Sequence, residues 1–240
     1  MFVIKNSRFI VPNLFTSISM LLGLTAIYSA FSGLWEHAAW LILLSAIMDK
    51  FDGTAARYLD ANSNFGVEYD SFSDFISFGI APASLMVSYF TDYYENESLV
   101  YFKVACASFV LLTAMRLSKY NSGEHKETGF FYGITSTHTG IMIASFFLFA
   151  YQYELPVLHD RDFVSGMMIF HGILMIAPFK SPKMKKSENT LYNFLQTFMV
   201  ILFIVLVIFR VFPVIIYIMG FMILVLGTGF YQLKKFLNRD

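Results

Sequence analysis

The chain has 240 residues, of which 57% are hydrophobic, 18% aromatic and 14% charged, and its mean hydropathy is +0.60. These values exclude an ordinary soluble globular domain and predict a membrane protein with several apolar helices. The 17 Lys and Arg residues balance the 17 Asp and Glu residues, so the net charge favours neither an acidic nor a basic partner, and we expect no nucleic-acid partner.

Eight apolar stretches, bounded by Pro, Gly and charged clusters, are long enough to cross about 30 Å of hydrocarbon. The stretches are 9–32, 35–56, 69–91, 99–117, 131–151, 163–179, 191–210 and 213–233. They predict an all-α bundle of about eight transmembrane helices, in which residues 1–240 form a single integral membrane domain with a catalytic core over roughly 9–151. The first stretch has no small-residue cleavage site, so we expect it to stay in the mature protein.

Positive charges predict the orientation, because Lys and Arg concentrate in cytoplasmic loops. Lys103, Arg161 and Arg210 fall on the opposite side, whereas the other positive charges fall before the first stretch, between stretches two and three, four and five, and six and seven, and in the tail. These other residues are Lys5, Arg8, Lys50, Arg57, Arg116, Lys119, Lys126, Lys180, Lys183, Lys185, Lys186, Lys234, Lys235 and Arg239. We therefore expect both termini and the loops between those stretches to be cytoplasmic, in what we expect to be the bacterial inner membrane.

The first stretch begins with two polar residues, Asn13 and Thr16, which lie one helical turn apart. At this position their side chains could reach a nucleotide or a lipid headgroup. Capping of the helix after Pro12 explains Asn13 almost as well.

Four aspartates lie where the second stretch ends and the third begins. Asp49 and Asp52 are three residues apart and Asp70 and Asp74 are four apart, so each pair shares one face of a helix. Carboxylates brought together without a counter-ion repel one another, whereas hard divalent cations accept several oxygen ligands. The spacing therefore predicts a site for Mg²⁺ or Mn²⁺ that opens to the cytoplasm.

Three further residues between the aspartate pairs suit a diphosphate. Gly53 and Gly66, predicted to flank the turn between the two helices, allow a ligand to approach the backbone closely. Arg57 offers a planar fork of donors that matches phosphate oxygens. Together with the metal ions, these residues predict a site that binds a pyrophosphate group from two sides.

The arrangement D-x2-D-G-x2-A-R-x8-G-x3-D-x3-D resembles the signature of the CDP-alcohol phosphatidyltransferase family. It is formed here by Asp49, Asp52, Gly53, Ala56, Arg57, Gly66, Asp70 and Asp74. The resemblance implies a membrane enzyme, commonly a homodimer, that transfers a phosphatidyl group from a CDP-linked lipid to an alcohol and releases CMP. It implies that Asp49, Asp52 and Asp70 bind metal and that Asp74 is the catalytic base. Metal coordination by Asp74 would weaken it as a base, so the sequence leaves both roles open.

We expect the signature residues between the aspartates to bind the CDP-lipid, and we add the two polar residues at the start of the first stretch because of their position. These substrate-binding residues are Gly53, Ala56, Arg57, Gly66, Asn13 and Thr16. Metal ions on the diphosphate would neutralise the charge that develops on the departing CMP.

Further segments are similar to the phosphatidylserine synthase branch of the family. They are PNLFTSISMLLGL (12–24), DSFSDFISFGIAPA (70–83), RLSKYN (116–121) and GFFYGITST (129–137). The similarity implies CDP-diacylglycerol and L-serine as substrates, and it favours Arg116, Lys119 and Asn121 as acceptor-binding residues because a zwitterionic amino acid needs both cationic and acceptor groups. Lys119 stands where the branch usually has a second arginine.

Two alternatives remain open at the level of the sequence. The acceptor could be another alcohol, glycerol 3-phosphate or an inositol phosphate, which would need a denser Arg and Lys pocket. The aspartates could instead form the permeation site of a divalent-metal transporter, which would leave Gly53, Arg57 and Gly66 without a role. A transporter also predicts acidic residues that continue to the far membrane face.

Overall fold

A computed structural model describes residues 7–95, 98–122, 130–182 and 190–237. In chain order, its helical segments are a 3-10 turn Ser7–Phe9, α1 Ile10–Phe31, α2 Trp35–Tyr58, α3 Asn64–Asp74, a π-helical segment Phe75–Ile80, α4 Ala81–Tyr93, α5 Val100–Asn121, α6 Ser136–Gln152, a 3-10 turn Pro156–Leu158, α7 Arg161–Ile176, α8 Thr190–Phe209 and α9 Pro213–Leu237. Two short strands, β1 Phe130–Tyr132 and β2 Lys180–Pro182, complete the described elements. The predicted all-helical architecture is confirmed, apart from this small ribbon.

Each of the eight predicted apolar stretches contains a helix. Within the part of the chain that the structure describes, α1 and α5 are the two helices that combine the length and the apolar composition expected of a membrane span. Several basic residues that predicted the orientation lie outside the described residues. They are Lys5, Lys126, Lys183, Lys185, Lys186 and Arg239. Gly129 of the segment 129–137 also lies outside them.

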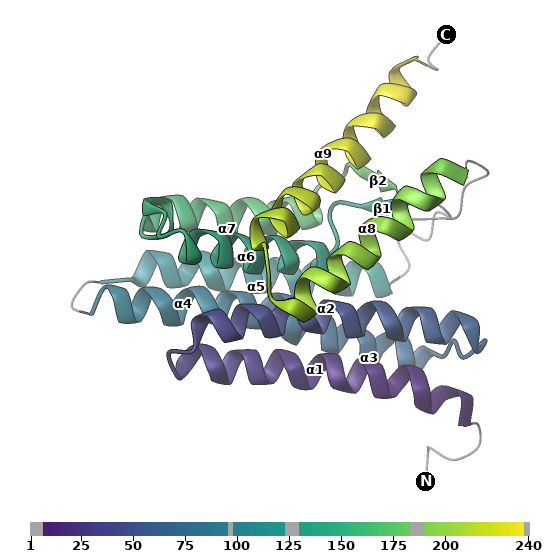
Figure 1. The fold of residues 1–240 in the computed structure, drawn as a ribbon, viewed down its shortest axis with the longest axis horizontal. Coiled ribbons are helices and arrows are strands. Elements are labelled where there is room, and N and C mark those ends of the chain that lie inside the picture. Colours follow the sequence, from purple (N-terminus) through teal and green to yellow (C-terminus); the bar gives the residue numbers. More distant parts are fainter. Residues whose placement is uncertain (1–6, 96–97, 123–129, 183–189, 238–240) are drawn as a thin grey trace.

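The helices α1 and α2 form an antiparallel hairpin that packs along its whole length (Figure 1). Gly33 closes the turn with a φ of 77°, a conformation that favours glycine. Hydroxyl groups hold the pair together, since Ser19 Oγ donates to the carbonyl oxygen of Ser45 at 3.0 Å. The hairpin places the start of α1 beside the end of α2, which is the end of the bundle that carries the aspartates.

The turn after α2 differs from the prediction. α2 continues to Tyr58 and α3 begins at Asn64, so the turn lies over residues 59–63 and Gly53 stands inside α2. The helix continues because Ala55, Ala56 and Arg57 are good helix formers. α3 starts early because Ser63 caps it, accepting a hydrogen bond from Gly66 N at 2.9 Å. Gly66 therefore lies in the first turn of α3, and the predicted placement of Gly53 at the turn is wrong.

The segment that follows Asp74 is a π-helix, Phe75–Ile80, which connects α3 to α4 without a break. It is packed on two sides. Ser77 Oγ donates to Ser19 O of α1 at 3.0 Å, and Gly140 of α6 lies so close that a Cβ there would be 2.8 Å from Cδ1 of Phe78. π-helical turns inside α-helices are frequent at functional sites. Here the π-helix fixes the helical segment that carries Asp70 and Asp74 between α1 and α6.

The strand β1 pairs with β2 in antiparallel register, with Phe131 opposite Ser181. Gly133 follows β1 with a φ of 66°, and α6 begins only at Ser136, where Thr135 accepts a hydrogen bond from His138 N at 3.2 Å. The prediction of a helix from residue 131 is therefore wrong at its start, because the glycine turn and the threonine cap both act against helix there.

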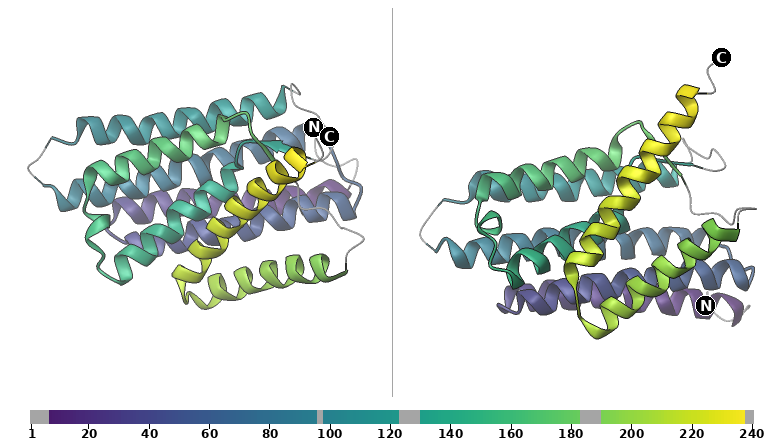
Figure 2. Two further views of the ribbon diagram at one scale, coloured as in Figure 1. Left: turned by 90° about the horizontal axis from the view of Figure 1, so that it is seen from above. Right: turned by 45° about the horizontal axis from the view of Figure 1, so that its top comes forward.

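The last two helices run obliquely across the others (Figures 1 and 2). α9 packs on α6 and then extends away from the bundle towards the C-terminus, while α8 contacts α2. Large apolar side chains of α8, such as Phe194 and Ile208, are more than half exposed, at 64% and 61%.

Candidate active site

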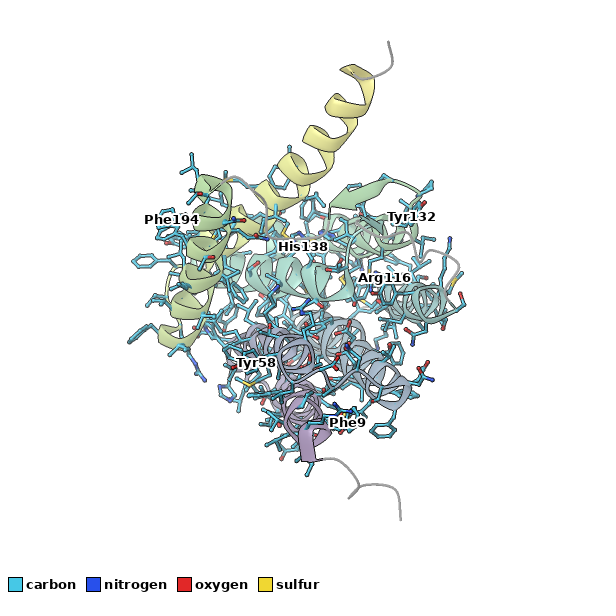
Figure 3. All side chains as sticks on the ribbon, turned by 90° about the vertical axis from the view of Figure 1, so that its right-hand side faces the viewer. Phe9, Tyr58, Arg116, Tyr132, His138 and Phe194 are labelled. Carbon is cyan, nitrogen blue, oxygen red and sulfur yellow. The ribbon has the colours of Figure 1, made fainter. Side chains whose placement is uncertain are left out.

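Three carboxyl groups converge at the end of the bundle where α1 begins and α2 ends (Figure 3 looks onto this end). Asp49 comes from α2, and Asp70 and Asp74 come from α3; one carboxylate oxygen from each lies within 4.8 Å of the other two. The carboxyl groups of Asp49 and Asp74 are within hydrogen-bonding reach of each other. The spacing of three and four residues thus places acidic groups of two helices in one place.

The fourth aspartate, Asp52, lies beside this group. It is buried, with 5% of its surface exposed. The side chain of Thr16 in α1 lies beside it, and the Thr16 hydroxyl donates to Pro12 O at 3.1 Å. The main chain of Thr16 is held in turn by α3, because Ser73 Oγ donates to Thr16 O at 3.2 Å. Thr16 therefore connects the first helix to the aspartates.

Several carboxylate oxygens in the site have no partner among the described residues. Asp52 Oδ2, Asp70 Oδ1 and Asp74 Oδ1 are buried and accept no hydrogen bond from any residue that the structure describes. Leaving such groups unsatisfied is costly, whereas Mg²⁺ and Mn²⁺ prefer oxygen ligands of this type. The donor set and its orphaned oxygens therefore fit a hard divalent cation.

Two hydroxyl groups from the start of α6 complete the surroundings of the aspartates. Ser136 Oγ donates to Asp74 Oδ2 at 2.8 Å, and Thr137 Oγ1 lies 3.4 Å from Asp49 Oδ2. Sequence reasoning did not single out either residue as functional. Their signal is present in the segment GFFYGITST, since these hydroxyl residues follow its glycine turn.

Three predicted diphosphate-binding residues, Gly53, Ala56 and Arg57, follow Asp49 and Asp52 along one face of α2. A Cβ at Gly53 would meet no atom within 4 Å, so the helix is open there. Arg57 is exposed. The open glycine and the exposed guanidinium leave room for a ligand next to the carboxylates.

Two further predicted ligand-binding residues, Gly66 and Asn13, face each other across α3 and α1. An added Cβ at Gly66 would lie 3.7 Å from Asn13 Oδ1 and 3.1 Å from Ser63 Oγ. Asn13 lies in the first turn of α1, whose N-cap is Phe9. The alternative role of Asn13 as a helix cap is therefore wrong.

The predicted acceptor-binding residues are at the end of α5, and they differ in their contacts. Asn121 Nδ2 donates to Glu68 at 3.1 Å and to Ser71 at 2.9 Å, while its buried Oδ1 has no partner among the described residues. Lys119 is exposed. Arg116 lies within the bundle (Figure 3) and donates from Nε to Ile134 O at 2.9 Å and from Nη1 to Ser136 Oγ at 3.0 Å.

The comparisons with known proteins agree with the geometry of the aspartates. A family model described as CDP-alcohol phosphatidyltransferase matches residues 9–177. The chain belongs to this family. The match includes α1 to α7 and so contains every predicted site residue of the CDP-alcohol phosphatidyltransferase signature.

Relatives within the CDP-alcohol phosphatidyltransferase family carry closely related names. Proteins called CDP-diacylglycerol–serine O-phosphatidyltransferase are similar to this chain in Helicobacter pylori strain J99 (31% identity, 85% of this chain and 84% of the relative) and in Bacillus subtilis strain 168 (34%, 75% and 94%). The archaetidylserine synthase of Methanothermobacter thermautotrophicus is 31% identical over 72% of this chain and 69% of the relative.

Proposed function

We propose that this chain transfers a phosphatidyl group from CDP-diacylglycerol to L-serine, yielding phosphatidylserine and CMP. The observation that carries the proposal is the convergence of Asp49, Asp70 and Asp74 within 4.8 Å, at the positions that the family signature assigns to metal and catalysis. The choice of serine is supported by the names of the bacterial relatives.

The proposal includes Mg²⁺ or Mn²⁺ held by the four aspartates Asp49, Asp52, Asp70 and Asp74. All but Asp49 have a buried oxygen without a partner among the described residues. When bound, the metal would neutralise negative charge on the diphosphate and on departing CMP. Gly53, Ala56, Arg57 and Gly66, with Asn13 and Thr16, are proposed to accommodate the CDP-lipid. The exposed guanidinium of Arg57 is suited to phosphate oxygens, and the open backbone at Gly53 allows close approach.

Asp74 is proposed to accept the proton of the serine hydroxyl. Its Oδ2 accepts from Ser136, whereas its Oδ1 is buried without a partner among the described residues. That second oxygen is the one available to a hydroxyl proton or to a metal. A base must lie within hydrogen-bonding reach of the proton that it removes.

The serine substrate is proposed to lie towards the end of α5, between Asp74 and the cytoplasm. Asn121 and Glu68 offer oxygen acceptors that suit an ammonium group, and Lys119 offers a cation for a carboxylate. Two of the nitrogens of Arg116 are already used by Ile134 and Ser136, so we assign Arg116 to holding the site together rather than to binding serine.

We further propose that all eight apolar stretches cross the bacterial inner membrane, with both termini and the aspartates cytoplasmic, and that the protein is a homodimer. The length and composition of α1 and α5 support a membrane location. A reporter that works only in the cytoplasm should be active when it is fused after Asp240. Activity of a reporter that works only outside the cytoplasm would contradict the orientation.

The mass of the purified protein in detergent, with the mass of the bound detergent subtracted, tests the dimer.

CMP release tests the reaction directly. Purified protein in lipid vesicles, given CDP-diacylglycerol, Mg²⁺ or Mn²⁺ and a panel of alcohols, should release CMP with L-serine and should stop when EDTA is added. No CMP with any alcohol would contradict the proposed function. CMP with glycerol 3-phosphate or an inositol phosphate alone would contradict serine as the acceptor.

The transporter alternative lacks support from the described interior of the bundle. Beyond the aspartates, the buried polar residues include Ser19, Ser45 and Ser145, whose hydroxyls donate to backbone carbonyl oxygens. Such hydroxyls are already satisfied and carry no charge. Uptake of Mn²⁺ into protein-containing vesicles, with no release of CMP, would favour transport instead.

A further inference from the structure

A chain of hydrogen bonds connects three elements at the active site. Arg116 of α5 donates to Ser136 of α6 at 3.0 Å, and Ser136 donates to Asp74 of α3 at 2.8 Å. We propose that Ser136, held by Arg116, is a positioning residue that fixes the orientation of the Asp74 carboxyl group. This inference rests in part on the proposed function, because it assumes that Asp74 acts in the reaction.

The direction of this chain follows from its chemistry. A guanidinium group can only donate, and a serine hydroxyl has a single proton. Ser136 therefore receives a hydrogen bond from Arg116 and gives its proton to Asp74. No other direction of the two hydrogen bonds satisfies both contacts of Ser136 while Asp74 is ionised.

Arg116 is held in place at a second point. Its Nε donates to Ile134 O at 2.9 Å, so the guanidinium contacts both the loop before α6, at Ile134, and the first residue of α6, Ser136. Contacts made by two nitrogens of one planar group fix its orientation. The loop itself is held by α7, since Ile134 N donates to Leu174 O at 3.1 Å.

The burial of Ser136 makes its role specific. Its side chain is fully buried, at 0% exposure, so the donor to Asp74 Oδ2 is the hydroxyl and not bulk solvent. The result is that the two oxygens of Asp74 differ: Oδ2 is occupied by Ser136, and Oδ1 is buried without a partner in the described part of the chain. A carboxylate fixed in this way presents one chosen oxygen to the metal or the substrate.

This role differs from the acceptor binding that the sequence suggests for Arg116. A residue that binds the carboxylate of serine would chiefly affect the KM for serine. A residue that positions Asp74 would affect the affinity for metal and kcat, and would leave the KM for serine nearly unchanged.

The test compares S136A with S136T and with a matched control. S145A removes another buried serine of α6. Among the described residues, its hydroxyl bonds to the backbone of its own helix, at Ile141 and Met142. For each purified variant, Mn²⁺ binding is measured by the EPR signal of free Mn²⁺, and kcat and the KM for serine are measured by CMP release.

We expect S136A to weaken Mn²⁺ binding and to lower kcat, each by about 10- to 100-fold, the usual range for groups that orient metal ligands. S136T, which keeps the hydroxyl, should recover most of both losses, and S145A should behave as wild type. R116K keeps the charge but cannot donate to Ile134 and Ser136 through one planar group, so it should resemble S136A. If S136A does not fold, the Mn²⁺ affinity, kcat and KM for serine of R116K test the positioning role in its place.

Two results would overturn the positioning role. One is Mn²⁺ binding and kcat within about twofold of wild type in S136A, below the range expected for such groups. The other is a raised KM for serine with unchanged kcat, which would place these residues at the acceptor. Wild-type protein that binds Mn²⁺ but releases no CMP with any alcohol would refute the proposed function, while the Mn²⁺ comparison would still decide the role of Ser136.

Discussion

The region from α1 to α7 and the region formed by α8 and α9 are built differently. In the first region, hydroxyl groups cross from helix to helix: Ser19 bonds to Ser45 O, Ser77 to Ser19 O and Ser88 to Ala30 O. In α8, the hydroxyl of Thr197 bonds within its own helix, to Asn193 O, and many large apolar side chains are exposed. Directional bonds between helices fix their relative positions, which a site built from several helices requires.

The boundary between the two regions coincides with the end of the family match, which covers residues 9–177 and ends before α8. The described site residues all lie in the cross-bonded region. This comparison predicts that substitutions in the first region change turnover or stability strongly, and that substitutions on the exposed face of α8 do not.

The largest effect is expected at the aspartates. D70N removes one of the three converging carboxylates and should lower CMP release by about 100-fold or more, because a metal ligand is lost. The matched control, D162N, lies at the start of α7, where Asp162 accepts a bond from Tyr101; it should leave turnover near the wild-type value. Near-normal turnover in D70N would remove Asp70 from the site.

The next effect concerns the packing around the π-helix. In G140A, the added Cβ would lie 2.8 Å from Cδ1 of Phe78, so the free energy of unfolding in detergent should fall by about 1–3 kcal/mol. The same change at Gly166 in α7 meets nothing within 4 Å and should be neutral or stabilising by up to about 1 kcal/mol, since alanine favours helix. Equal effects of G140A and G166A would mean that the π-helix is not closely packed.

A smaller effect is expected at the start of α3. S63A removes the side chain that caps this helix through Gly66 N and should cost about 1 kcal/mol of folding stability. S63D retains an acceptor and should restore most of that loss. Denaturation curves of the two variants, measured in the same detergent, test this; a stability of S63A equal to wild type would show that the cap contributes nothing.

The smallest effect is expected on α8. F198L changes a side chain that is 49% exposed, and it should alter the free energy of unfolding by less than about 0.5 kcal/mol, with turnover unchanged. The same substitution at Phe147, which is fully buried in α6, should cost about 1 kcal/mol or more. A large loss of activity in F198L would contradict the division into two regions and would point to a functional contact on α8.

The amino-acid sequence by itself determined the apolar stretches, all of which contain helices, and the signature residues of the family from Asp49 to Asp74. Both are local patterns: helical periodicity and fixed spacings within one turn can be recognised without knowing what packs against them. Helix ends were less well predicted, as at α3 and α6, because a capping serine or a glycine turn acts at single positions.

Only the tertiary structure decided which distant residues complete the site. Ser136 lies 62 residues from Asp74 along the chain, and Thr137 lies 88 from Asp49. Nothing in the local pattern of GITST assigns these hydroxyls to particular carboxylates, and the π-helical packing of Phe75–Ile80 depends on glycines of two other helices. Such pairings follow from how helices pack in three dimensions, since side-chain contacts depend on interhelical position and a sequence pattern records only the order along the chain.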